Sequence, residues 1–153
     1  MSNRTVYLTT TTLQPISKIP EGYSVQIWRP SLFKLKPPGK PLKYLIFSFA
    51  SVLKLLSNRN FFQISVYNQS TLVSSLLVVP KIYKFPYMNK KDIQFIYVMT
   101  NYEYRGKSIA AATILESTRY LIDTVESFWY VTSEDNIASL KLAEKLGFKI
   151  HKK

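Results

Sequence analysis

Cysteine is absent from the 153-residue sequence, and histidine occurs once, at His151 near the carboxyl end. Without cysteine the chain can form neither a disulfide bond nor a thiolate nucleophile, and a lone histidine provides no zinc site, so we expect no metal. No apolar run reaches the roughly 20 residues that cross a bilayer, and the polar start lacks the apolar core of a signal peptide. These absences favour a soluble protein, which we expect to be cytoplasmic.

Acidic side chains are missing from nearly half of the chain. No aspartate or glutamate occurs from Gly22 to Lys91, an interval that contains eleven lysines and arginines. The formal net charge of +12 falls within residues 1–91, because residues 92–153 carry 8 basic and 8 acidic side chains. A field of one sign attracts the opposite charge, so we expect an anionic ligand such as a nucleotide-linked sugar. A solvated surface without a dedicated partner, nucleic acid and an anionic membrane surface are the alternatives.

The length and the apolar content of 46% predict one domain, residues 1–153, with a sizeable core. Apolar runs predict strands at residues 5–12, 61–67, 72–79, 93–100 and 128–132, the second and third of which form an antiparallel hairpin. Helices are predicted at residues 42–57 and 107–123, and a last helix begins at Asp135 or Asn136 and ends at Gly147. This order of strands and helices indicates an α/β fold of the mixed α+β type.

The helix predicted at residues 42–57 carries an apolar stripe with the spacing of one helix face: Leu45, Phe49, Val52, Leu53 and Leu56. We expect this stripe to pack into the core. A helix that lies on a membrane surface is the alternative.

A turn with small residues joins the strand at 93–100 to the next helix, and its sequence is Arg105-Gly106-Lys107-Ser108-Ile109-Ala110. The first N–H groups of a helix have no partner within the helix, and the helix dipole places positive charge behind them. The small side chains allow an anion to approach these groups closely. The turn therefore predicts a seat for a phosphate or a pyrophosphate.

The segment from Asn136 to Phe148, which contains the last helix, follows this turn in the sequence. In this order and spacing, residues 92–149 resemble the acetyl-CoA-binding half of the GNAT superfamily of N-acetyltransferases. The resemblance implies a largely antiparallel mixed sheet that is flanked by helices and splayed where acetyl-CoA, the cosubstrate, binds. Residues 92–153 would form the acetyl-CoA-binding half, and residues 1–91 the basic acceptor-side half. Ser108 stands where the family has its first glycine, and the resemblance predicts that the seat is retained if the turn avoids a positive φ at this position.

The resemblance also assigns the residues that would touch the cofactor. The strand segment Val98, Met99 and Thr100 would bond the pantetheine arm, and residues 105–110 would hold the pyrophosphate. Asn136 and Ser139 match positions at which the last helix meets the cofactor, although Asn136 is equally suited to be a helix N-cap. The charged residues Lys141, Glu144 and Lys145 are expected on the solvated face of that helix.

Catalysis is less well specified. Many relatives place a glutamate base near the position of Gln94 and a tyrosine acid at the position of Ala143. Gln94 cannot act as a base, but it could hold a water that relays a proton to Asp92. Tyr97 is a second candidate if its side chain points into the cleft. Each has a structural alternative, with Asp92 as a turn residue at the start of a strand and Tyr97 as a core aromatic residue.

We therefore expect an acetyl-CoA-dependent N-acetyltransferase whose acceptor is a small anionic amine, namely a nucleotide-linked amino sugar of surface-polysaccharide synthesis. Acetylation of a protein or peptide is the alternative among enzymes. A non-catalytic basic module that binds nucleic acid or an anionic membrane is the alternative outside them, and nucleic acid is the less favoured partner. Relatives end in two strands, whereas six residues follow Gly147. Either the last strand is missing, or the amino-terminal region or a second subunit of a homodimer takes its place.

Overall fold

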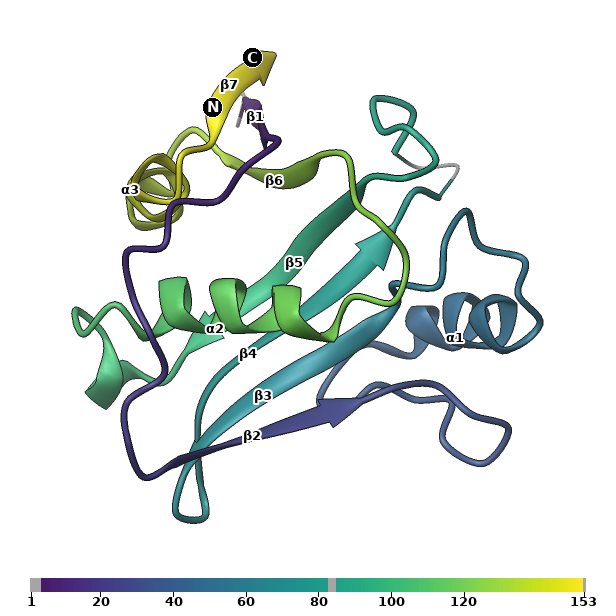
Figure 1. Ribbon diagram of the computed structural model, residues 1–153, viewed down its shortest axis with the longest axis horizontal. Coiled ribbons are helices and arrows are strands. Elements are labelled where there is room, and N and C mark those ends of the chain that lie inside the picture. The colour runs from purple at the N-terminus through teal and green to yellow at the C-terminus, as the bar shows by residue number, and fades with distance from the viewer. Residues whose placement is uncertain (1–3, 83–84, 153) are drawn as a thin grey trace.

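One sheet organises the chain. The computed structural model describes residues 4–82 and 85–152, in which seven strands are arranged in the order β2-β3-β4-β5-β6-β1-β7 (Figure 1). The strands are β1 (Thr5–Thr10), β2 (Tyr23–Trp28), β3 (Phe62–Asn68), β4 (Thr71–Pro80), β5 (Ile93–Thr100), β6 (Phe128–Ser133) and β7 (Lys149–Lys152). Two residues of the connection between β4 and β5, 83–84, lie outside the described part.

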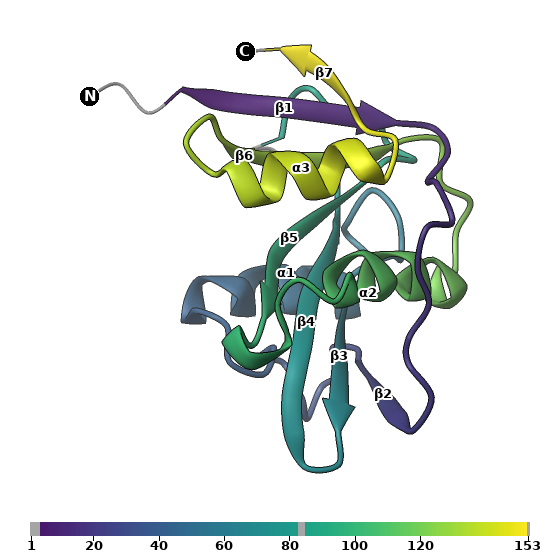
Figure 2. The ribbon, with the colours of Figure 1, turned by 90° about the vertical axis from the view of Figure 1, so that its left-hand side faces the viewer.

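Helices cover both faces of this sheet (Figures 1 and 2). They are α1 (Leu45–Val52), α2 (Ile109–Ser117) and α3 (Ile137–Lys145), with 3-10 turns η1 (Leu42–Tyr44), η2 (Tyr102–Tyr104) and η3 (Thr118–Tyr120). Successive residues of a strand point to opposite faces. Accordingly Leu76 and Val78 of β4 share a core with α2, whereas Leu77 and Val79 share a second core with Phe47 of α1.

The predicted hairpin of β3 and β4 is confirmed, and both strands are almost wholly buried. Strand β2 was not predicted, although Tyr23-Ser24-Val25-Gln26-Ile27 alternates between apolar and polar residues in the manner of an edge strand. It pairs antiparallel with β3 and closes one edge of the sheet.

The sheet is splayed between β5 and β6, as the resemblance implied. These strands are parallel and pair only from Ile93 to Phe95 on β5. All the other strand pairs of the described chain are antiparallel. Within β5, Tyr97 and Val98 together oppose one residue of β4, and Tyr97 has a left-handed φ of 51°. Such a β-bulge bends its strand and increases the local twist, which carries β5 away from β6.

Strand β1 lies between β6 and β7 and pairs with both. Of the alternatives for the position beside β6, the amino-terminal region is therefore the one that fills it. The helix α3 ends as predicted, since Gly147 has a φ of 89° and the Phe148 N–H donates to the Ala143 carbonyl at 3.0 Å. Phe148 is then buried against Phe95 and Tyr130.

The prediction for residues 42–57 is wrong in two respects. The helix is shorter than predicted, because α1 follows η1 and ends at Val52. Lys54, two residues later, has a left-handed φ of 57°. Most of the helix's apolar stripe also faces outward, since Phe49 and Leu53 are half exposed, whereas Leu56 packs against the second core as expected. The helix instead docks through Phe47 and the fully buried Ser48, since the Phe47 ring enters the core beside Phe61.

Candidate functional site

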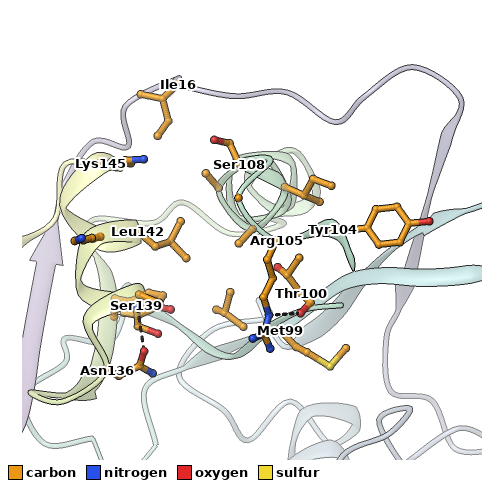
Figure 3. Close-up of a pocket in the computed structure, with 18 residues that line it drawn as sticks. Ile16, Met99, Thr100, Tyr104, Arg105, Ser108, Asn136, Ser139, Leu142 and Lys145 are labelled. Carbon is orange, nitrogen blue, oxygen red and sulfur yellow. Dashed lines mark hydrogen bonds between the residues drawn. The ribbon is translucent and has the colours of Figure 1, made fainter. Parts of the chain in front are cut away.

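A cavity of about 530 Å³ lies where β5 and β6 part (Figure 3). All the residues expected to bind the cofactor line this cavity except Lys107. They belong to β5, to the turn into α2 and its first residues, and to the start of α3. The lining consists of Ile16, Val98, Met99, Thr100, Tyr104, Arg105, Gly106, Ser108, Ile109, Ala110, Ala111, Tyr130, Asn136, Ala138, Ser139, Lys141, Leu142 and Lys145. Two segments recognised separately in the sequence thus meet at one cavity.

The amino-terminal end of α2 supplies unpaired donors to this cavity. The N–H groups of residues 108–111 have no hydrogen-bond acceptor among the described residues, and Ala112 is the first to bond, to the Ser108 carbonyl at 3.0 Å. All four of these residues line the cavity. The helix dipole adds positive potential at the same point, so the site is suited to an anion.

The turn into α2 does not avoid a positive φ at Ser108, which was the condition set for the seat. The φ of Ser108 is 56°, in the left-handed region, and Gly106 has a φ of 75°. The Ser108 hydroxyl makes no capping hydrogen bond, so the side chain does not compensate for this conformation. The Ser108 carbonyl, however, accepts from both the Ala112 N–H and the Ser17 hydroxyl, which hold the turn in place. A left-handed residue other than glycine costs about 1–2 kcal/mol.

The charged side chains that line the cavity are all positive, namely Arg105, Lys141 and Lys145. Arg105 extends across the cavity, and its Nε donates to the Thr100 carbonyl at 3.3 Å (Figure 3). Lys141 and Lys145 are exposed, as expected, but they also form part of the lining. Lys107 does not, and its Nζ lies 5.3 Å from the centre of the Tyr104 ring.

On the α3 side, Asn136 is the helix N-cap, because its Oδ1 accepts from the Ser139 N–H at 3.1 Å (Figure 3). Both residues also line the cavity, so capping and ligand contact are compatible at Asn136. The position at which relatives have a tyrosine acid is occupied by Ala143, which is fully buried.

Asp92 and Gln94 lie in one aromatic cluster that does not line the cavity. The fully buried Asp92 accepts, at Oδ2, from the Asn89 N–H at 2.8 Å and from the Trp129 indole at 2.9 Å. Gln94 accepts from the Tyr87 hydroxyl at 2.6 Å, and the Tyr87 ring packs on Trp129. Burial, more than any neighbour, raises the pKa of Tyr87. These contacts match the structural alternative for Asp92, a turn residue at the start of β5.

Tyr97 is placed differently, on the side of the sheet that α1 covers. Its ring packs on Tyr44 at 5.5 Å and lies 5.3 Å from the Nζ of Lys40. It is 40% exposed, so it is not a core aromatic residue. Burial, followed by the Tyr97 hydroxyl, raises the pKa of Tyr44, and burial lowers the pKa of Lys40.

The sequence did not single out Tyr130, which lines the cavity at the point where the strands part. It pairs with Phe95, which is the last residue of β5 that pairs with β6. Burial raises the pKa of its hydroxyl, and a hydrogen bond with Ser139 partly offsets this rise. The hydroxyl therefore remains protonated at neutral pH. Nothing in the apolar run 128–132 marks this residue, because its position depends on the register between β5 and β6.

No cluster of three or more histidine, cysteine, aspartate or glutamate residues that could hold a metal ion occurs in residues 4–82 and 85–152. The lining groups are main-chain donors, hydroxyls, amides and cations. Unbonded main-chain N–H groups and cationic side chains of this kind bind anions.

Several solved structures with this architecture are described as GNAT-family or GCN5-related N-acetyltransferases, so the chain has the GNAT fold. A GCN5-related N-acetyltransferase-like protein from Streptococcus suis has a TM-score of 0.59 and 19% identity, with 97% of this chain and 58% of that one covered. A tandem GNAT protein from the clavulanic acid biosynthesis pathway gives 0.63 and 16%, with 97% and 50% covered. A GNAT-family acetyltransferase from Colwellia psychrerythraea gives 0.62 and 14%, with 98% and 53% covered.

The chain therefore spans between 50% and 58% of the length of these three proteins. Comparison of the sequence with protein-family models and with curated proteins finds no match. At such identities the likeness establishes the fold.

If Asp92 is structural, its removal should destabilise the protein. Asp92→Ala leaves the Trp129 indole and the Asn89 N–H without their buried acceptor, and we expect a loss of about 2–3 kcal/mol in the free energy of unfolding. Urea unfolding measures this loss. Asp92→Asn keeps an acceptor oxygen and should lose less. A stable Asp92→Ala variant would show that the buried contacts of Asp92 contribute little.

Proposed function

We propose that the protein is an acetyl-CoA-dependent N-acetyltransferase. The observation that carries this proposal is the convergence of three features on one cavity between parted strands. These are the unbonded N–H groups of α2, an all-positive set of charged side chains and the free edge of β5. From residue 96 to residue 100, the edge of β5 that faces away from β4 has no strand partner among the described residues.

The residues present fit coenzyme A in kind. Its pyrophosphate needs main-chain donors and cations, which residues 108–111 and Arg105 provide. Its pantetheine amides need a polar edge, which β5 offers beside Val98, Met99 and Thr100. When bound, acetyl-CoA supplies an activated acetyl group. Main-chain donors that are fixed where negative charge develops lower a reaction barrier, often by about 3–4 kcal/mol.

Ser108 provides the test of the phosphate seat. Ser108→Glu places a carboxylate among the donors of α2, and we expect loss of the binding of acetyl-CoA without loss of the fold. Isothermal calorimetry measures the binding, and thermal unfolding gives an independent readout, since a ligand at 100 times its Kd adds about 2.7 kcal/mol of stability. Ser108→Asn is the matched control, because asparagine is neutral and tolerates the left-handed conformation. Normal binding by folded Ser108→Glu would place the cofactor elsewhere.

For the proton that the amine must lose, the candidates remain Tyr97 and the Gln94–Asp92 pair. Tyr97 is favoured by its exposure on the side of α1 and by its proximity to Lys40. The Gln94–Asp92 pair is the less favoured candidate, because Asp92 is fully buried and its Oδ2 already accepts from the Asn89 N–H and the Trp129 indole. The departing sulfur also receives a proton. The Tyr130 hydroxyl is the favoured donor, because it is protonated and Tyr130 lies where β5 and β6 part.

Tyr130→Phe removes this hydroxyl while keeping the ring. We expect kcat to fall about 10²-fold, the lower range for general acid catalysis, with the Kd of acetyl-CoA nearly unchanged. Tyr104→Phe, in the same lining, is the matched control and should keep its kcat. Steady-state kinetics and calorimetry together separate the two effects. An unchanged kcat for Tyr130→Phe would mean that the sulfur departs without help from this side chain.

For the acceptor we propose an anionic amine, with a nucleotide-linked amino sugar as the preferred form. The acid-free interval from Gly22 to Lys91, which contains Lys40 beside Tyr97, supports this choice. In an acetyl-transfer assay with a panel of amines, nucleotide diphosphate amino sugars should give the highest kcat/KM, and this value should fall as salt is added. Lysine peptides and neutral amino sugars are the comparison. Faster acetylation of a peptide would favour the protein-acetylating alternative.

A further inference from the structure

The solvent side of α1 and of η1 before it is apolar. Leu42, Ile46, Phe49 and Leu53 are 66%, 69%, 50% and 49% exposed, respectively. Their spacing of four, three and four residues places them on one side of the helix. The name α1 face is used here for these four residues together with Lys43 and Lys54, which lie next to its two ends in the sequence.

The fold does not require this stripe. On its inner side the helix is already anchored by Phe47 and the fully buried Ser48. The four apolar residues of the α1 face belong to neither core of the described chain. An aligned set of large apolar side chains left in water is typical of a surface that binds a partner.

The charges that flank the stripe in the sequence are of one sign. Lys43 and Lys54 are exposed, as are Lys34 and Lys36 in the preceding loop, and no acidic residue occurs from Gly22 to Lys91. The same loop carries Phe33, which is 96% exposed. Exposed Phe, Leu and Ile combined with lysines, without acidic residues, is the composition of a helix that lies in the interface of an anionic bilayer.

Other partners match these features less well. Nucleic acid offers phosphates to the lysines, but its backbone has no apolar surface for Ile46 and Phe49. A symmetric dimer would place the α1 face against its own copy, so that lysines would oppose lysines. Protein interfaces in general are depleted in lysine at their centres. An anionic bilayer satisfies both features, because apolar side chains enter the acyl boundary and lysines remain among the headgroups.

We propose that the α1 face docks the protein peripherally on an anionic lipid surface. In the described residues, no helix is long and apolar enough to span a membrane. Because α1 and α2 cover opposite faces of the sheet, a bilayer against α1 leaves α2 and the cavity beside it on the far side (Figure 2). Docking is therefore compatible with cofactor binding and does not depend on the proposed acetyl transfer.

Sedimentation of the full chain with lipid vesicles tests the proposal. Vesicles of phosphatidylcholine mixed with phosphatidylglycerol should bind the protein, whereas vesicles of phosphatidylcholine alone should bind it at least 10-fold less. Added salt should weaken the binding, because each lysine near a charged surface contributes an electrostatic attraction. Equal binding to both kinds of vesicle, or binding to neither, would overturn the proposal.

Two pairs of variants separate the apolar and the electrostatic parts. Ile46→Ser with Phe49→Ser, and separately Lys43→Gln with Lys54→Gln, should each lower partitioning at least 10-fold. The matched controls are Ile122→Ser with Ile150→Ser, which removes two half-exposed apolar side chains elsewhere, and Lys18→Gln with Lys149→Gln. The controls should bind vesicles like the parent. Equal losses in variants and controls would show that no particular face is involved.

A fluorescent reporter tests insertion independently of the loss-of-binding variants. Phe49→Trp should show a blue-shifted emission with mixed vesicles and no shift with neutral ones, compared in each case with the parent, which contains tryptophans elsewhere. Analytical ultracentrifugation tests the protein alternative. If the parent self-associates and Ile46→Ser with Phe49→Ser abolishes that association, the α1 face is an interface between copies and the proposal fails.

Discussion

The short parallel pairing between β5 and β6 is the constraint on which the rest of the structure depends. The two strands share only the register from Ile93 to Phe95, after which each follows a different neighbour. Strand β5 stays with β4 and bends at the Tyr97 bulge, whereas β6 pairs along its whole length with β1. The wedge between them exposes the edge of β5 and leaves room for α2 and α3 on either side. The cavity is thus a consequence of sheet topology, and its side chains come from elements that the topology brings together.

Positive and negative side chains of residues 92–153 lie in different places, although they balance in number. This half is neutral in sum, yet the charged side chains around its cavity are all positive. The balance is possible because several acids of this half pair with cations away from the cavity: Asp123 with Arg59, Glu126 with Lys91 and Glu116 with Arg119. Arg59 also lowers the pKa of Asp123, chiefly through their side-chain hydrogen bond. The excess charge of residues 1–91 is therefore separate from the cations that line the cavity, which is why we propose a second, anionic ligand for it.

Local signals predicted the parts of the site that local geometry determines. The small residues from Gly106 to Ala110 and the Gly147 terminus each specify a turn, and these turns lie where they were expected. What failed depended on long-range packing. The apolar stripe through Phe49 exists, but periodicity does not determine whether a stripe faces the core or the solvent. The helix is oriented by Phe47, which packs against the second core. The place of Tyr130 in the cavity depends on strand register, for which a single sequence contains no direct signal.

Two strained backbone positions also lie on the elements that form the cavity. Four residues other than glycine have positive φ in the described structure. Gln69 lies in the β3–β4 turn, and Lys54 follows Leu53, the C-cap of α1, at a position where left-handed residues are common. The remaining two are Tyr97, which forms the β-bulge of β5, and Ser108, which is the N-cap of α2, and both elements contribute to the lining of the cavity. Strain of this kind persists only where the surroundings hold it, and it gathers at binding sites. A serine that is held left-handed without a capping bond is therefore better explained by the donors it directs into the cavity than by helix stability.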